Sequence, residues 1–119
     1  DSGPYLQYSL TRALSVLEKA KTEKIKASLK NTPESLGDLE RILHRFPEVV
    51  ARAGKELEPH YIAVYLTELA SQFNNYYAKN KIVDKADAVS PYRVAVTEAF
   101  SVVMKNGLWL LGVNHLEKM

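Results

Sequence analysis

The stretch PHYIAVYLTELASQFNNYY, residues 59–77, has the clearest pattern in this sequence. Its apolar side chains recur every three or four residues, which places them on one face of a helix of about five turns. These side chains belong to Ile62, Tyr65, Leu66, Leu69, Ala70, Phe73, Tyr76 and Tyr77. Pro59 suits the start of such a helix, because proline is tolerated in the first turn. We expect this helix to cross the whole domain.

Helices are also expected on the N-terminal side of that stretch. Apolar residues three and four apart predict a long helix over residues 5–29. Thr32 is placed to cap a second helix that begins at Pro33. Because Pro47 falls too late in the pattern to lie inside that second helix, we expect a kink or a new helix over residues 47–54.

The C-terminal third is expected to contain a loop and one more helix. Residues 80–89 are mixed and weakly periodic, whereas Ser90 and Pro91 repeat the cap-and-proline signal of a helix start. Gly112 is a natural end for that helix. Because no stretch alternates like a strand and no segment repeats, we predict an all-α fold. It is a non-repetitive bundle of four to six helices in a single domain over residues 1–119.

The composition is that of an ordinary globular protein. Of the 119 residues, 46% are apolar and 25% are charged, which argues against disorder and against a transmembrane class. The absence of cysteine excludes a disulfide scaffold, a thiol nucleophile and a thiolate zinc site. No run approaches the roughly 20 apolar residues of a membrane span, and the first residues given lack the basic-then-apolar pattern typical of a signal peptide. We therefore expect a cytoplasmic protein without a membrane partner. Its start at Asp1 suggests a piece of a longer chain.

Positive charge is concentrated in one part of the chain, although the net charge is only +2. Between positions 12 and 30 the sequence has six basic residues and only two acidic ones, Glu18 and Glu23. The basic residues are Arg12, Lys19, Lys21, Lys24, Lys26 and Lys30. Since five of the six fall within the first expected helix and Lys30 directly follows it, that helix is the positive pole, and it is either a binding surface or a solvated face.

The residue patterns of common active sites are missing. The three histidines, His44, His60 and His115, lie in separate segments without an HExxH or triad-like arrangement. Neither a GxGxxG nor a GxxxxGK[ST] phosphate-binding loop occurs. We therefore expect no catalytic residue and no metal site, and we expect the isolated domain not to be an enzyme.

Binding of an unstacked RNA base is better supported. Tyr5, Tyr8 and Arg12 are three and four residues apart, so they lie along one helix face where the basic stretch begins. Two aromatic rings beside a guanidinium offer a base a stacking surface and hydrogen-bond donors. The alternative is that both tyrosines close the core and leave only their hydroxyls at the surface.

A second group of aromatic residues lies near the end of the 59–77 helix. Its members are Phe73, Asn74, Tyr76, Tyr77 and Lys81. Phe73 and Tyr76 are expected to be structural, whereas Tyr77 and Lys81 are expected to face solvent. Trp109 is interpreted as a residue of the core or of a subunit interface.

Several stretches, in this order, carry a family resemblance. They are GPYLQY at 3–8 followed by Arg12, FPEVV at 46–50, the 59–77 stretch, and the closing segment 93–119. These stretches are similar to the GPYLQYxxxR, PHxxxxYLxxLAxxFxxFY and RxxLxxxxxxVLxNGLxLLGxxxPExM patterns of one family. The chain thus resembles the C-terminal anticodon-binding domain of arginyl-tRNA synthetase, the all-helical DALR type.

The resemblance implies a parent enzyme that activates arginine with ATP and magnesium and joins it to its transfer RNA. Its HIGH and KMSKS-like motifs, which belong to a Rossmann-type core, do not occur here. The resemblance therefore assigns neither catalysis nor a cofactor to this piece, which is expected to be the monomeric C-terminal fragment of the synthetase. Its partners are then the anticodon loop of arginine tRNA and the catalytic core of the full-length chain.

The resemblance also implies site residues. Tyr5, Tyr8, Arg12 and Met119 correspond to the surroundings of the central anticodon base, and Tyr77 and Lys81 are their neighbours around the loop. Met119 is then the natural C-terminus. The sequence departs from the family where many members have Cys-Arg, because Asn80-Lys81 replaces a planar bidentate donor by a point charge.

The central anticodon base is a single feature to read, because all arginine codons have G in the middle and every arginine anticodon therefore has a central cytosine. Arg12 can donate to the N3 and O2 atoms of cytosine, a backbone carbonyl can accept from N4, and a tyrosine can stack. Lys19, Lys24 and Lys26 would attract phosphates without sequence choice. The alternative function is a helical protein-interaction module in which Trp109 and the tyrosines bind a partner helix or form a dimer.

Overall fold

The helix on which the fold prediction rests is α4, which spans His60–Lys79. Six of its apolar side chains are buried, namely Ile62, Tyr65, Leu66, Leu69, Ala70 and Phe73. Tyr76 is half-buried and Tyr77 is exposed. The computed structural model describes residues 2–56 and 58–118, and the side chains of residues 3–56 and 58–112.

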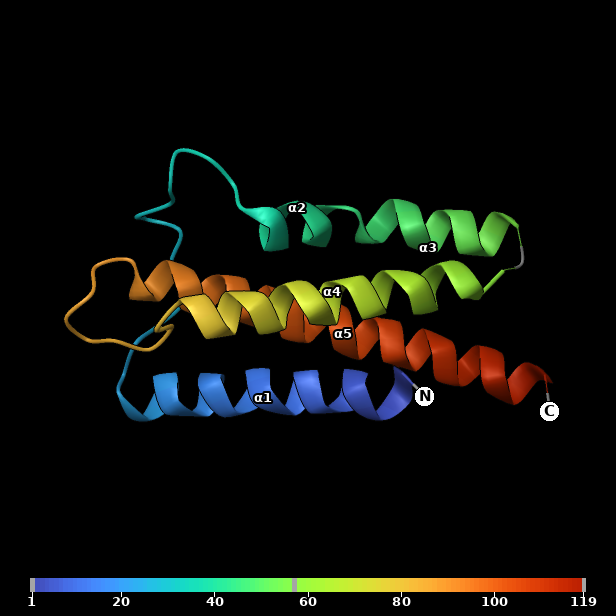
Figure 1. Ribbon diagram of the computed structural model, residues 1–119, viewed down its shortest axis with the longest axis horizontal. Coiled ribbons are helices and arrows are strands. Elements are labelled where there is room, and N and C mark those ends of the chain that lie inside the picture. Colours follow the sequence, from blue (N-terminus) through green and yellow to red (C-terminus); the bar gives the residue numbers. More distant parts are fainter. Residues whose placement is uncertain (1, 57, 119) are drawn as a thin grey trace.

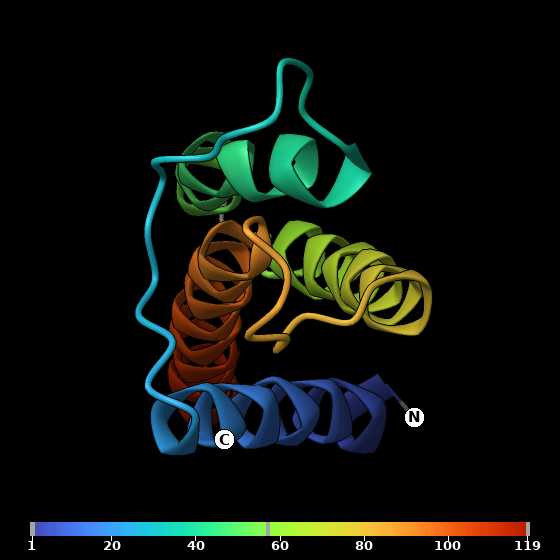
Figure 2. The same ribbon diagram turned by 90° about the vertical axis from the view of Figure 1, so that its left-hand side faces the viewer.

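The helices form three layers (Figures 1 and 2). The middle layer consists of α4 and α5, and α5 spans Ser90–Lys118. One side is covered by α1, Ser2–Thr22, and the other by α2, Asp38–His44, with α3, Phe46–Lys55. All regular secondary structure in the described residues is helical, so the all-α prediction is confirmed. The molecule is elongated, with extents of 50 × 27 × 20 Å.

The centre of the core joins α4 to α5. The Phe73 ring stacks on Phe100, with ring centroids 4.2 Å apart and an interplanar angle of 9°. Seven residues after Phe100 on α5, a Cβ on Gly107 would lie 2.5 Å from Leu66 Cδ2. Only glycine therefore allows the two helices to approach as they do. On the other side α1 contributes three buried apolar residues, Leu6, Ala13 and Ala20.

The first helix is shorter than expected. It ends at Thr22 and not at residue 29, because residues 20–25 form a Schellman motif. The Ile25 N–H donates to the Ala20 carbonyl at 2.9 Å and the Lys24 N–H to the Lys21 carbonyl at 3.1 Å. Lys24 adopts the left-handed conformation with φ of 59°. The chain then leaves the helix axis.

The second helix begins later than expected, at Asp38 and not at Pro33. The predicted cap was wrong, since the Thr32 hydroxyl donates to the Leu29 carbonyl. Residues 23–37 form a linker that runs from the α1 layer to the α2 layer beside α5 (Figure 2). Two contacts fasten it, because Ser28 N–H donates to the Pro91 carbonyl and Asn31 Nδ2 donates to the Ala88 carbonyl. The new helix at Pro47 is confirmed by α3.

The last helix is longer than expected, since α5 continues through Gly112 to Lys118. The expected loop over residues 80–89 is confirmed, and Ser90 holds it. The Ser90 hydroxyl accepts from the Asp84 N–H at 3.0 Å and donates to the Ile82 carbonyl at 2.6 Å.

The α5 helix is also the most hydrophobic in mean hydropathy. By length and composition alone, residues 90–112 could cross a membrane, with a mean hydropathy of 1.3 over a window that is 39% buried. In this structure α5 contacts α1, α2 and α4. A helix with so many neighbours needs apolar residues on most of its faces, which accounts for that hydropathy.

Candidate nucleic-acid interface

The Arg12 side chain lies between two tyrosine rings from different helices. Its guanidinium carbon is 4.8 Å from the ring centroid of Tyr8, one turn before it on α1, and 4.3 Å from that of Tyr77 on α4. A cation over an aromatic face is attracted by the ring quadrupole. The structure thus joins Tyr8 and Arg12, predicted from one face of α1, to Tyr77.

Asn74 connects the same two helices through hydrogen bonds. Its Oδ1 accepts from Arg12 Nη1 at 3.0 Å, and its Nδ2 donates to the Tyr5 hydroxyl at 3.1 Å and to Ser9 Oγ at 3.0 Å. The Tyr8 hydroxyl accepts from Arg12 Nη2. We call Tyr5, Tyr8, Arg12, Asn74 and Tyr77 the tyrosine–arginine cluster.

The aromatic side chains of this cluster are accessible. Tyr5 is 39% exposed, Tyr8 is 54% exposed and Tyr77 is 41% exposed. Tyr5 and Tyr8 belong neither to the buried core nor to the residues packed against it. The alternative interpretation, in which both tyrosines close the core, is therefore wrong. Their rings remain available to a ligand.

The charge of Arg12 is not neutralised by a carboxylate among the described side chains. The ion pairs found there use other arginines, for example Arg93, which pairs with Asp87 at 2.8 Å. Arg12 instead contacts neutral groups, namely two tyrosines and an amide. Because these neutral partners leave the full positive charge in place, the cluster favours a ligand that is anionic or rich in hydrogen-bond acceptors.

Lys81 lies in a pocket beside the cluster, and not within it. The pocket has a volume of about 280 Å³, and Tyr77, Lys81 and Lys19 are among its lining residues. It is formed by the end of α1, the end of α4 and the loop that follows α4. Tyr77 therefore belongs to both the cluster and the pocket. Two of the predicted lysines, Lys19 and Lys81, line this pocket together.

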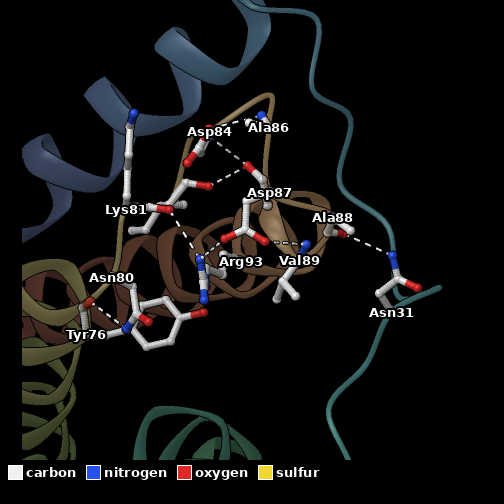
Figure 3. Close-up of polar contacts among 12 residues, drawn as sticks. Asn31, Tyr76, Asn80, Lys81, Asp84, Ala86, Asp87, Ala88, Val89 and Arg93 are labelled. Atoms are coloured by element: carbon white, nitrogen blue, oxygen red, sulfur yellow. Dashed lines mark hydrogen bonds and ion pairs between the residues drawn. The ribbon is translucent and has the colours of Figure 1, made fainter.

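The loop that carries Lys81 is fixed by Arg93 (Figure 3). Arg93 Nη1 donates to Asp87 Oδ2 at 2.8 Å and to the Lys81 carbonyl at 3.4 Å. The Val89 N–H donates to Asp87 Oδ1 at 2.9 Å. This N–H, together with Arg93, holds the pKa of Asp87 below its ordinary value. The Lys81 side chain extends toward α1 in Figure 3.

Other predicted site residues are not brought to the cluster. Lys24 and Lys26 are exposed, but they lie beyond the end of α1 and not on that helix as expected. Met119 is outside the described residues, so its predicted place near the central base stays a prediction. Trp109 was interpreted as a core or interface residue, and the first interpretation is wrong because its side chain is 68% exposed.

The sequence did not assign a role to Asn74, although a signal for one exists. Asn74 is three residues before Tyr77, so both lie on one face of α4. Its partners on α1 lie more than sixty positions away in the chain. The periodicity of α4 therefore indicated the face of Asn74 but not what the amide contacts.

The described residues contain no group of three or more His, Asp or Glu side chains placed to hold a metal ion. A larger pocket of about 410 Å³ lies between the linker, α2 and α5, and none of its lining residues belongs to the cluster. The side chain of His115 is outside the described residues.

Known proteins share sequence similarity with this chain. A family model described as DALR anticodon binding domain matches residues 6–119. The whole chain aligns with arginine–tRNA ligase from Pyrococcus abyssi at 37% identity and covers 20% of that protein. It aligns with the arginine–tRNA ligases of Latilactobacillus sakei and Pediococcus pentosaceus at 38% and 40% identity, and covers 21% of each. The chain thus spans about a fifth of the length of the curated relatives it matches.

Proposed function

This chain belongs to the DALR anticodon binding domain family, and we propose that it binds the anticodon loop of arginine tRNA as one part of a longer arginine–tRNA ligase. The whole chain aligns with about a fifth of each such ligase, which supports a parent enzyme of this kind. Attachment of arginine and binding of ATP with magnesium then belong to the rest of the parent. This piece supplies recognition of the RNA.

The observation that carries the proposal is the placement of Arg12 between Tyr8 and Tyr77. Exposed aromatic rings offer a stacking surface to an unstacked base, worth about 1–3 kcal/mol per base. The unpaired charge of Arg12 beside them supplies donors for the base edge or the backbone. Both features occur at one place, and α1 and α4 hold them there.

The base that this site reads is, in our proposal, the cytosine at the centre of the anticodon. Arginine codons share a central G, so this cytosine is common to all arginine anticodons. Cytosine presents two adjacent acceptors, N3 and O2, to the donors of Arg12. A tyrosine of the cluster stacks on its ring.

The neighbouring lysines add attraction without sequence choice. Lys19 and Lys81 line one pocket with Tyr77, and Lys24 and Lys26 are exposed beyond α1. Lysine contacts to phosphates release counterions, so their contribution falls as salt rises. They orient the loop while the cluster reads the base.

The proposal is tested by titrating Arg12→Ala and Lys24→Ala variants with two stem-loops that differ only at the central cytosine. Arg12→Ala is expected to lower the preference for cytosine by about tenfold, the scale of one charge-assisted hydrogen bond. Lys24→Ala is expected to weaken both RNAs alike. Arg12→Lys is the matched control for charge, because it keeps the charge but loses the planar donor fork. Equal losses for both RNAs in both alanine variants would contradict base reading.

A protein-interaction role is the competing function. The exposed Trp109 and Val102, seven residues apart on α5, are the observation that favours it. We infer that RNA recognition is the main role, because the family match points to it. Light scattering that shows a monomer, together with salt-dependent RNA binding, would count against the competing role.

A further inference from the structure

The orientation of the Asn74 amide is dictated by chemistry. A guanidinium is only a donor, so the Asn74 atom that meets Arg12 Nη1 at 3.0 Å must be the carbonyl oxygen Oδ1. The amide nitrogen then faces α1, where its two hydrogens go to the Tyr5 hydroxyl and to Ser9 Oγ. Each polar atom of Asn74 therefore has a defined role as donor or acceptor.

This orientation sets the direction of the hydroxyl protons around it. The Tyr5 hydroxyl accepts a hydrogen bond from Asn74, so its own proton points elsewhere. The Tyr8 hydroxyl accepts a hydrogen bond from Arg12 Nη2, so the Tyr8 hydroxyl proton also points elsewhere. Ser9 differs, because its proton is already donated to the Tyr5 backbone carbonyl at 3.0 Å. Within the described side chains, neither tyrosine hydroxyl donates to another group.

The cluster therefore offers donors to a ligand. They are the two tyrosine hydroxyls and the N–H groups of Arg12 that neither Asn74 nor Tyr8 uses. A guanidinium has five N–H donors, of which these two contacts occupy two. The Asn74 carbonyl oxygen is already bound to Arg12.

We propose that Asn74 is a positioning and specificity-determining residue that turns the free donors of Arg12 and the hydroxyl proton of Tyr5 toward the ligand. The ligand group that fits is an edge with two adjacent acceptors and no donor between them. Cytosine has such an edge in N3 and O2, whereas uracil presents an N3–H donor at the same place. The inference rests on the proposed function and deepens it, because it assigns rejection of uracil to an amide that need not touch the RNA.

The test measures binding of three stem-loops that have cytosine, uracil or an abasic nucleotide at the centre of the anticodon. The abasic loop keeps every phosphate, so it separates donors that read the base from donors that contact the backbone. Wild-type chain is expected to bind the cytosine loop at least tenfold more tightly than either of the others. Equal binding of the abasic and cytosine loops would place the donors on phosphate and overturn the inference.

Asn74→Asp is the decisive variant. The introduced carboxylate still accepts from Arg12, but it cannot donate, so the Tyr5 and Ser9 hydroxyls turn their protons toward it. We expect the preference for cytosine over uracil to fall about tenfold, as in Tyr5→Phe, which removes the same donor directly. Asn75→Asp is the matched control. Asn75 is exposed on α4 next to the cluster, and this substitution introduces the same negative charge. That variant is expected to keep the wild-type preference.

A coupling measurement separates positioning from a purely structural role. Asn74→Asp in an Arg12→Ala, Tyr5→Phe background is expected to change the preference by less than twofold, because the donors it controls are already gone. A structural role predicts the same loss in both backgrounds. If Asn74→Asp unfolds the chain, Tyr5→Phe alone still tests the inference, because unchanged preference in that variant contradicts it.

The results also separate this inference from the proposed function. If the wild-type chain prefers cytosine and Asn74→Asp keeps that preference, the inference is wrong and anticodon reading stands. If the wild-type chain binds the three loops equally, both are wrong. A loss in Asn74→Asp together with an unchanged Asn75→Asp supports both.

Discussion

The Arg12 guanidinium carbon lies 4.3 Å from the ring centroid of Tyr77, and this contact joins the first helix of the chain to the fourth. Both side chains are partly accessible, so the contact is at once part of the fold and part of the binding surface. A ligand that binds there meets a guanidinium already held in place. Less conformational entropy is then lost on binding.

Replacing the Tyr77 ring should therefore affect stability and binding together. Tyr77→Leu is expected to lower the free energy of unfolding by about 1 kcal/mol, the scale of a partly exposed cation–π contact, and to weaken RNA binding. Tyr77→Phe keeps the ring face and is expected to behave like the wild type in urea unfolding. Equal destabilisation by both variants would show that the hydroxyl matters and not the ring.

Gly107 is expected to tolerate no side chain. Gly107→Ala places a methyl group against Leu66, and we expect a loss of about 1–3 kcal/mol in the free energy of unfolding. Gly112→Ala is the control on the same helix, because no described atom outside the local helix lies within 4 Å of its Cβ position. Alanine is favoured over glycine in helices by up to about 1 kcal/mol, so this control should be neutral or stabilising. Thermal unfolding of both variants measures the difference.

Stability is expected to fall at alkaline pH. Burial raises the pKa of Tyr65 from 10.0 to about 12, with Arg45 opposing the shift. A group whose pKa is raised on folding stabilises the fold fully below its unfolded pKa, and that contribution is lost as pH rises toward the folded value. The free energy of unfolding should therefore decrease between about pH 10 and pH 12. Tyr65→Phe should make the decrease shallower, although it also loses the hydrogen bond to the Ile42 carbonyl.

The opposite sign is expected for Asp87 in acid. Its pKa is held below the ordinary value of 3.8, first by the Val89 N–H and then by Arg93. The stabilising contribution is present above that ordinary value and is lost as pH falls through the lower folded value. Asp87→Asn is expected to remove this pH dependence and to speed amide hydrogen exchange in residues 84–90. Asp38→Asn, at an exposed ion pair with Arg41, should leave exchange in that loop unchanged.

The fold was predictable where apolar periodicity is long. The face of α4 was correct from Ile62 to Phe73, because burial of a whole helix face dominates local propensity, whereas Tyr76 and Tyr77 at its end are only half-buried and exposed. The end of α1 was not predictable, since its Schellman motif has Lys24 at the position that glycine usually occupies. The start of α2 was missed because contacts to Ala88 and Pro91 hold the linker in an extended form.

The binding site was predictable only in part. Helical spacing placed Tyr5, Tyr8 and Arg12 on one face, and the structure keeps them together. The contact of Arg12 with Tyr77 and the role of Asn74 depend on how α1 packs against α4, which no local pattern reveals. The place of Trp109 was left open between the core and an interface for the same reason, because a helix with neighbours on several sides has a weak periodic pattern.

The most direct test of the account is a titration of the wild-type chain with an arginine anticodon stem-loop and with a matched loop whose central cytosine is replaced by guanine, at two salt concentrations. We predict that binding to both loops weakens as salt rises, because lysines contact phosphates. The preference for cytosine should persist at the higher salt, because the tyrosine–arginine cluster reads the base. Equal binding of the two loops at both salt concentrations would contradict the account.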